Sequence, residues 1–66
     1  MALLPGDKVT YKTDYRMQHG IVKSLSVTDG FVFVVYDCGG NWEDYENYTG
    51  ELTNNIDLVE GWIDLQ

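Results

Sequence analysis

The sequence has few of the residues from which small proteins build covalent or metal links. Cys38 is the one cysteine among 66 residues, so no internal disulfide can form and no thiolate metal site can be built from it alone. His19 is the one histidine, which removes any His-pair metal site and leaves no acid–base pair for catalysis. We therefore expect no catalytic residue, no metal and no cofactor, and a reducing, cytoplasmic location.

Long apolar runs are also lacking. No stretch approaches the roughly 20 apolar residues of a membrane span, and the apolar run within residues 1–9 is too short for a signal peptide. One proline, seven glycines and 44% hydrophobic residues are typical of a compact globular chain and not of a disordered or collagenous one. We expect residues 1–66 to form a single soluble domain, with a core that its short length keeps small.

Basic residues are scarce, and all four lie within the first 23 positions. The net charge is −7, and nine of the eleven acids lie between Asp29 and Asp64 with no base among them. Binding to a nucleic-acid backbone draws on many Lys and Arg contacts, so nucleic acid is not the expected partner. Two interpretations stay open: a charged surface that prevents self-association, or an acidic face directed at a basic protein.

The strand signals are short and separated by turns, and no long helical period is present. Residues 7–12 alternate, with Val9 and Tyr11 on one face. Residues 13–19 are polar and predict a loop, residues 20–27 predict a second strand, and the Asp-Gly pair at 29–30 predicts a tight hairpin because it supplies positive φ. Further strands are expected at 31–36, 50–53 and 61–65, with a tight 3₁₀-like turn at 55–58.

The strand predicted at 31–36 is apolar on both faces. One face must fill the core, so the other must be covered, and we expect the face of Val32, Val34 and Tyr36 to be covered by segment 41–49 or by a second copy of the chain in a homodimer. Asn41 is a candidate N-cap, and the acids that follow it favour the first turn of a helix. The sequence thus predicts a short helical turn between strands three and four.

Five short strands in this arrangement resemble an SH3-like barrel of the Tudor or KOW kind. The resemblance rests on "PGDKVTYK", "HGIVKSL", the Asp-Gly hairpin and "IDLVEGWIDL", and it implies an all-β, five-stranded SH3-like barrel; a small OB-like barrel is the alternative. The chain also looks like short uncharacterised proteins of bacteria and their phages that carry "HGIV", "VYDCGG" and "YTG" in this order, a likeness that implies no function.

Tudor-like relatives hold a methylated cation in an aromatic cage. Carried over to this chain, the resemblance implies walls from Tyr11 or Tyr15, from Tyr36, and from Trp42 or Tyr45, with Asp44 or Glu46 alongside. Independently of it, Trp42, Tyr45 and Tyr48 recur every third residue, which gives a short helical turn one aromatic side. The candidate binding residues are therefore Tyr11, Tyr15, Tyr36, Trp42, Asp44, Tyr45, Glu46 and Tyr48.

The alternatives for function belong to different classes. The first is a protein-binding module whose surface at 41–49 docks a cationic or amide-rich partner. The second is a phage-type acidic inhibitor or adaptor that presents carboxylates to a basic host protein. Nucleic-acid binding through the basic end and an enzymatic role rank behind both, because the cations are few and because Cys38 and His19 lack sequence-near partners for chemistry. We expect Cys38 to act as a small buried hydrophobe.

Overall fold

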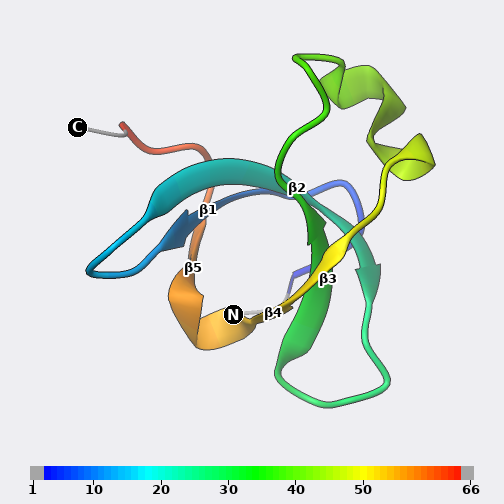
Figure 1. Cartoon of the computed structure of the whole chain (residues 1–66). Helices are drawn as coiled ribbons and strands as arrows, with labels where there is room; N and C mark the ends of the chain where they lie inside the picture. Colours follow the sequence, from blue (N-terminus) through cyan, green and yellow to red (C-terminus); the bar gives the residue numbers. More distant parts are fainter. Residues whose placement is uncertain (1–2, 65–66) are drawn as a thin grey trace.

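Five antiparallel strands form one sheet in the computed structural model, which describes residues 3–64 (Figure 1). The sheet order is β4-β3-β2-β1-β5. Two 3₁₀ turns interrupt the strands, one of them between β3 and β4. The all-β architecture with five strands and a short helical turn between strands three and four is thereby confirmed. In chain order the elements are β1 (Lys8–Lys12), β2 (Met17–Leu25), β3 (Phe31–Val35), η1 (Trp42–Asn47), β4 (Glu51–Asn54), η2 (Asn55–Asp57) and β5 (Leu58–Glu60).

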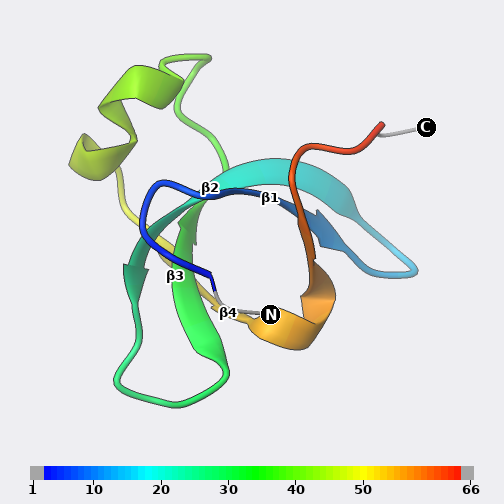
Figure 2. The same ribbon diagram turned by 180° about the vertical axis from the view of Figure 1, so that it is seen from behind.

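The sheet is strongly curled, yet its hydrogen bonding does not close into a ring (Figures 1 and 2). Its two edge strands, β4 and β5, are joined through η2 without pairing with each other. The architecture is therefore a curled open sheet with two free edges, and not a closed barrel.

The core lies on the inner face of the curl and is built mainly of small β-branched side chains. On this face Val9 of β1 stands opposite Gly20 of β2, and Val22 stands opposite Val34 of β3. Valine suits a tightly curved sheet because its side chain is short and stiff. The buried cluster consists of Leu3, Val9, Val22, Val32, Val34, Tyr36 and Leu58, with Tyr11 packed against it.

The two faces of β3 are exchanged relative to the sequence prediction. Val32, Val34 and Tyr36 fill the core, so segment 41–49 does not cover them. Instead η1 packs against β2 on the opposite face, where Val35 pairs with Ile21 and both are buried. Cys38 is buried as well, as expected. Alternation along residues 31–36 assigns the side chains to two faces. Because both faces are apolar, it does not predict which face is directed towards the core.

The first hairpin is tighter than the polar sequence at 13–19 predicted. β2 already begins at Met17, and the backbone N–H of Thr13 donates to the carbonyl of Arg16 at 2.9 Å. Polar residues are tolerated in this strand because they find partners: the Gln18 amide donates to the Tyr36 carbonyl at 3.5 Å, and His19 is bonded to the C-terminal segment. Tertiary hydrogen bonds thus extend a strand that local composition does not favour.

The second hairpin contains the positive φ that the Asp-Gly pair predicted. Gly30 has φ of +84°, and the turn is closed by the N–H of Phe31 donating to the carbonyl of Thr28 at 3.3 Å. No non-glycine residue within 3–64 has positive φ, so Asp29 does not take the conformation of a two-residue type I′ turn. The loop is correspondingly longer.

The last strand lies earlier in the chain than predicted. β5 spans Leu58–Glu60, whereas the strand expected at 61–65 does not form over 61–64, and Leu65 lies outside the described residues. The tight 3₁₀ turn expected at 55–58 is present as η2. Across residues 3–64 no helix is long and apolar enough to cross a membrane.

Gly20 of β2 leaves no room for a side chain against Val34, and its replacement tests the packing. A Cβ on Gly20 would lie 2.6 Å from Cγ1 of Val34 and 3.0 Å from both Cδ1 of Tyr36 and the carbonyl oxygen of Val35. Gly20→Ala should therefore lower the free energy of unfolding by about 1–3 kcal/mol, measured by urea denaturation. The loss of stability caused by Gly20→Ala should be smaller in a Val34→Ala background, because Cγ1 of Val34 is then absent. Equal urea midpoints for Gly20→Ala and wild type would contradict this packing.

Candidate functional site

The segment after β5 folds back onto the outer face of the sheet. Its anchor is Thr10, which is fully buried. The Thr10 hydroxyl donates to the carbonyl of Gly61 at 2.8 Å and accepts from the N–H of Ile63 at 3.1 Å. Nε2 of His19 lies 2.6 Å from the carbonyl of Ile63 and, because a carbonyl only accepts, this nitrogen is the donor. These bonds fix the position of the residue between them, Trp62.

Trp62 lies at the centre of an aromatic cluster on this face. Its indole Nε1 donates to the carbonyl of Gly20 at 2.9 Å, and its ring stacks on His19 with centroids 5.2 Å apart and an interplanar angle of 10°. Trp42 of η1 packs against it at 5.0 Å and 56°. Nζ of Lys8 lies 4.7 Å from the Trp62 ring centroid, a cation–π contact. One ring thus joins β1, β2 and η1.

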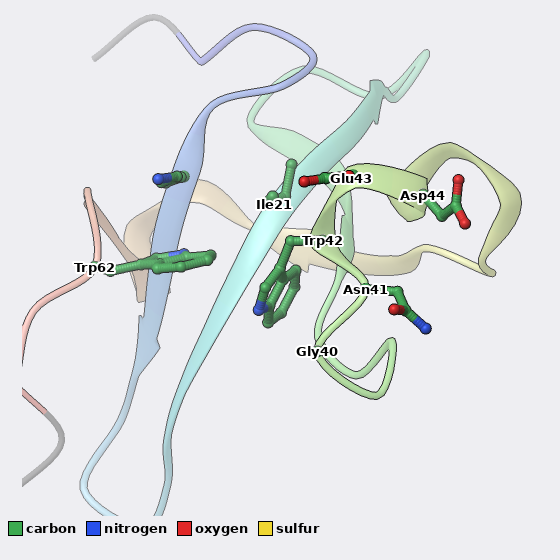
Figure 3. Close-up of a pocket in the computed structure, with 8 residues that line it drawn as sticks. Ile21, Gly40, Asn41, Trp42, Glu43, Asp44 and Trp62 are labelled. Carbon is green, nitrogen blue, oxygen red and sulfur yellow. The ribbon is translucent and has the colours of Figure 1, made fainter.

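An open cleft of about 580 Å³ lies where η1 meets the β1–β2 face. The two tryptophans form its apolar walls (Figure 3). In this view Glu43 points towards Ile21, whereas Asp44 and Asn41 point away from the two rings and form the rim. The cleft therefore offers flat aromatic surface beside carboxylates. Its lining residues are Lys8, Ile21, Gly40, Asn41, Trp42, Glu43, Asp44 and Trp62.

Two of the three evenly spaced aromatics of segment 41–49, Trp42 and Tyr45, lie in η1, which is kinked at Asp44, whereas Tyr48 is the extended residue that ends it. Trp42, Tyr45 and Tyr48 are all half-buried. Tyr45 extends its hydroxyl to within 3.4 Å of where a Cβ on Gly6 would lie, and the carbonyl of Tyr48 accepts from Nζ of Lys23 at 2.6 Å. The aromatic side of η1 thus faces the sheet, while the acids stay exposed: Glu43, Asp44 and Glu46.

A second aromatic group lies on the inner side of the sheet, around Tyr11 and Tyr36. The two rings meet edge to face with centroids 5.8 Å apart and an interplanar angle of 79°. The guanidinium carbon of Arg16 lies 5.3 Å from the Tyr11 centroid and 5.5 Å from that of Tyr36. Gln18 holds the guanidinium there, since its Oε1 accepts from both Nε and Nη2 of Arg16. The chain therefore places its own cation over this aromatic pair.

The phenol of Tyr36 belongs to a buried polar contact. Its hydroxyl oxygen lies 2.7 Å from Oγ1 of Thr53, and the Thr53 hydroxyl in turn donates to the carbonyl of Glu51 at 3.2 Å. Burial raises the pKa of Tyr36 above its ordinary value of 10.0, since desolvation disfavours the phenolate, while the hydrogen bond with Thr53 opposes the shift. The nearby carboxylate of Glu51 adds to the increase.

The predicted site residues therefore fall into separate places. Tyr11 and Tyr36 meet on the inner side, whereas Trp42 and Tyr45 lie with η1 on the outer side, so no single cage of the kind the Tudor resemblance implied is assembled. Tyr15 is 97% exposed at the first hairpin and joins neither group. Asp44 is brought to the rim of the cleft. Tyr45 and Glu46 of η1, and Tyr48 directly after it, do not line the cleft.

Trp62 is the cleft residue that sequence reasoning missed. The alternating "GWIDL" suggested a strand, but Gly61 has φ of +81° and turns the chain out of β5. The glycine directly before the tryptophan was the available signal, because a positive φ interrupts a ladder. Other lining residues were likewise not among the predicted site residues, although two of them, Asn41 and Glu43, lie within the predicted surface at 41–49: Lys8, Ile21, Gly40, Asn41 and Glu43.

Comparison of the chain with protein-family models, with curated proteins and with solved structures finds no match. The candidate site therefore rests on its own geometry.

The raised pKa of Tyr36 gives stability a defined pH dependence. The pKa of Tyr36 is higher in the folded than in the unfolded chain. The neutral phenol therefore contributes fully to the free energy of unfolding below about pH 10, and this contribution is lost as the pH rises through the folded pKa. Tyr36→Phe should remove this loss, which can reach about 1.4 kcal/mol per pH unit between the two pKa values. Urea denaturation across alkaline pH measures it, with exposed Tyr15→Phe as the matched control. Parallel stability curves for Tyr36→Phe and wild type would contradict the assignment.

Proposed function

We propose that this protein is a small acidic protein-binding module, and that its docking surface is the cleft between η1 and the β1–β2 face. The observation that carries the proposal is the contact of Trp42 with Trp62 at the wall of an open cleft, next to the Glu43 carboxylate. Tryptophan commonly contributes a large share of binding energy at protein interfaces because it buries a wide, rigid surface.

The chemistry of the cleft favours a cationic or amide-rich partner. Indole faces attract cations and stack on planar amide and guanidinium groups, and Lys8 already occupies one face of Trp62. The exposed acids of η1 add negative potential at the same mouth, which speeds the approach of a basic surface. We further propose that the fold is related to SH3-like barrels of the Tudor or KOW kind, supported by five antiparallel strands with a helical turn before the last one.

A second candidate is an acidic inhibitor or adaptor, which the outward position of the η1 carboxylates favours. Glu43, Asp44 and Glu46 are all exposed, so they could engage a basic host protein without the tryptophans. The two candidates differ in what binding depends on. Loss of charge alone, in a Glu43→Gln, Asp44→Asn, Glu46→Gln variant, should abolish binding for an inhibitor of this kind, whereas the docking cleft should also require the Trp42 ring.

The proposed cleft predicts a specific loss in Trp42→Ala. A partner purified from a lysate of the native host on the immobilised protein should bind Trp42→Ala more weakly by roughly 1–3 kcal/mol, measured by titration, while the fold persists by circular dichroism. Tyr15→Ala removes an exposed aromatic ring outside the cleft and should bind like wild type. Added salt should slow association, since it screens the acids of η1. Unchanged affinity in folded Trp42→Ala would rule the cleft out.

A further inference from the structure

Within residues 3–64, β4 is an edge strand that pairs only with β3, so the other side of its backbone is unpaired in this part of the chain. The N–H of Asn55 donates to the carbonyl of Gly30 at 2.8 Å, which sets the phase of the β3–β4 ladder. Hydrogen-bonded pairs alternate along an antiparallel ladder, so Thr53 and Glu51 bond to β3. The N–H and C=O of Leu52 and the N–H of Asn54 accordingly point away from the sheet.

A groove of about 310 Å³ follows this same edge. All four residues of β4 line it, together with Asp57 of η2, Arg16, Tyr11 and Tyr36. Leu52 is 55% exposed, so its side chain does not close the edge. An unpaired stretch of strand therefore borders an open hollow.

The groove already holds a cation over an aromatic pair. The guanidinium of Arg16 lies within 5.5 Å of both tyrosine centroids, and the carboxylates of Glu51 and Asp57 line the same hollow. Arg16 is itself exposed, and its guanidinium donates hydrogen bonds to the Gln18 side chain. An incoming cation can therefore displace it from the two rings with a small loss of free energy. The geometry thus shows where a guanidinium or ammonium group fits.

We propose that the β4 edge is a second binding surface, which accepts an extended basic peptide by strand addition. The peptide backbone pairs with Leu52 and Asn54, and one Arg or Lys side chain takes the place of Arg16 over Tyr11 and Tyr36. This surface is distinct from the tryptophan cleft and shares no lining residue with it. A second copy of the chain is a poor occupant, since it carries the same net charge of −7 and its own β4 carries Glu51.

A blocked peptide of three Val-Arg repeats provides the probe. Titrated at millimolar concentration into the ¹⁵N-labelled protein, it should shift the amide resonances of Leu52 and Asn54. A peptide of three Val-Glu repeats should not, because the groove carboxylates repel it. A Val-Arg peptide that is N-methylated at alternate amides, on the edge that faces β4, should lose binding because it lacks the backbone donors that strand addition needs.

Two substitutions at one position separate backbone pairing from side-chain contact. Leu52→Pro deletes an outward-facing N–H, a replacement that edge strands tolerate, and should weaken peptide binding roughly tenfold. Leu52→Ala keeps the N–H and should bind close to wild type. Arg16→Ala frees the two rings and should tighten binding roughly two- to fivefold, the share of one exposed cation–π contact.

Several results would overturn the proposal. They are absence of shifts at Leu52 and Asn54, equal binding of the N-methylated peptide, and wild-type affinity in folded Leu52→Pro. If Leu52→Pro does not fold, the N-methylated peptide decides the question alone. Shifts that instead centre on Trp62 and vanish in Trp42→Ala would assign the basic peptide to the tryptophan cleft and leave β4 as a shielded edge.

Discussion

The hydroxyl of Thr10 holds the outer face of this small sheet together. It is fully buried and bonds both to Gly61 and to Ile63, so the chain after β5 is drawn over β1 and β2. Trp62 is then placed between two of these anchors, where it covers His19 and meets Trp42. A chain this short has room for only a small core, and on the outer face of β2 this segment covers His19 while η1 packs beside it. The candidate cleft is a product of that covering layer.

The same arrangement explains why the two aromatic groups remain apart. Strand residues alternate between faces, so Tyr11 belongs with Val9 and the core, while Lys8 and Thr10 belong with the outer layer. Tyr36 shares the inner face with Val34, and η1 comes down on the opposite side. Each group carries a cation from the first third of the chain, Lys8 in one and Arg16 in the other. Two of the four basic residues thus lie on aromatic rings.

Much of the fold could be predicted from local patterns. The alternation around Val9 and Tyr11 and the positive φ of Gly30 follow from short-range rules. The helical turn forms directly after Asn41 as predicted, although the Asn41 side chain makes no capping hydrogen bond. The faces of β3 could not be predicted, because "FVFVVY" is equally apolar on both. The strand at Met17 was missed since its polar side chains find partners only in the folded state. Among site residues, the η1 aromatics were found from spacing alone, whereas Trp62 depended on Gly61 interrupting the last strand.

The unpaired β4 edge of the open sheet carries part of the chain's acidic charge. Curling a five-stranded sheet without pairing β4 to β5 leaves backbone groups free at an edge, and such edges invite aggregation unless they are short or charged. Here the β4 edge is four residues long and is flanked by Glu51 and Asp57. Those carboxylates repel identical copies, yet they attract a basic strand. Under the proposed strand addition, the charge that disfavours a second copy at this edge is therefore the same charge that selects a basic peptide.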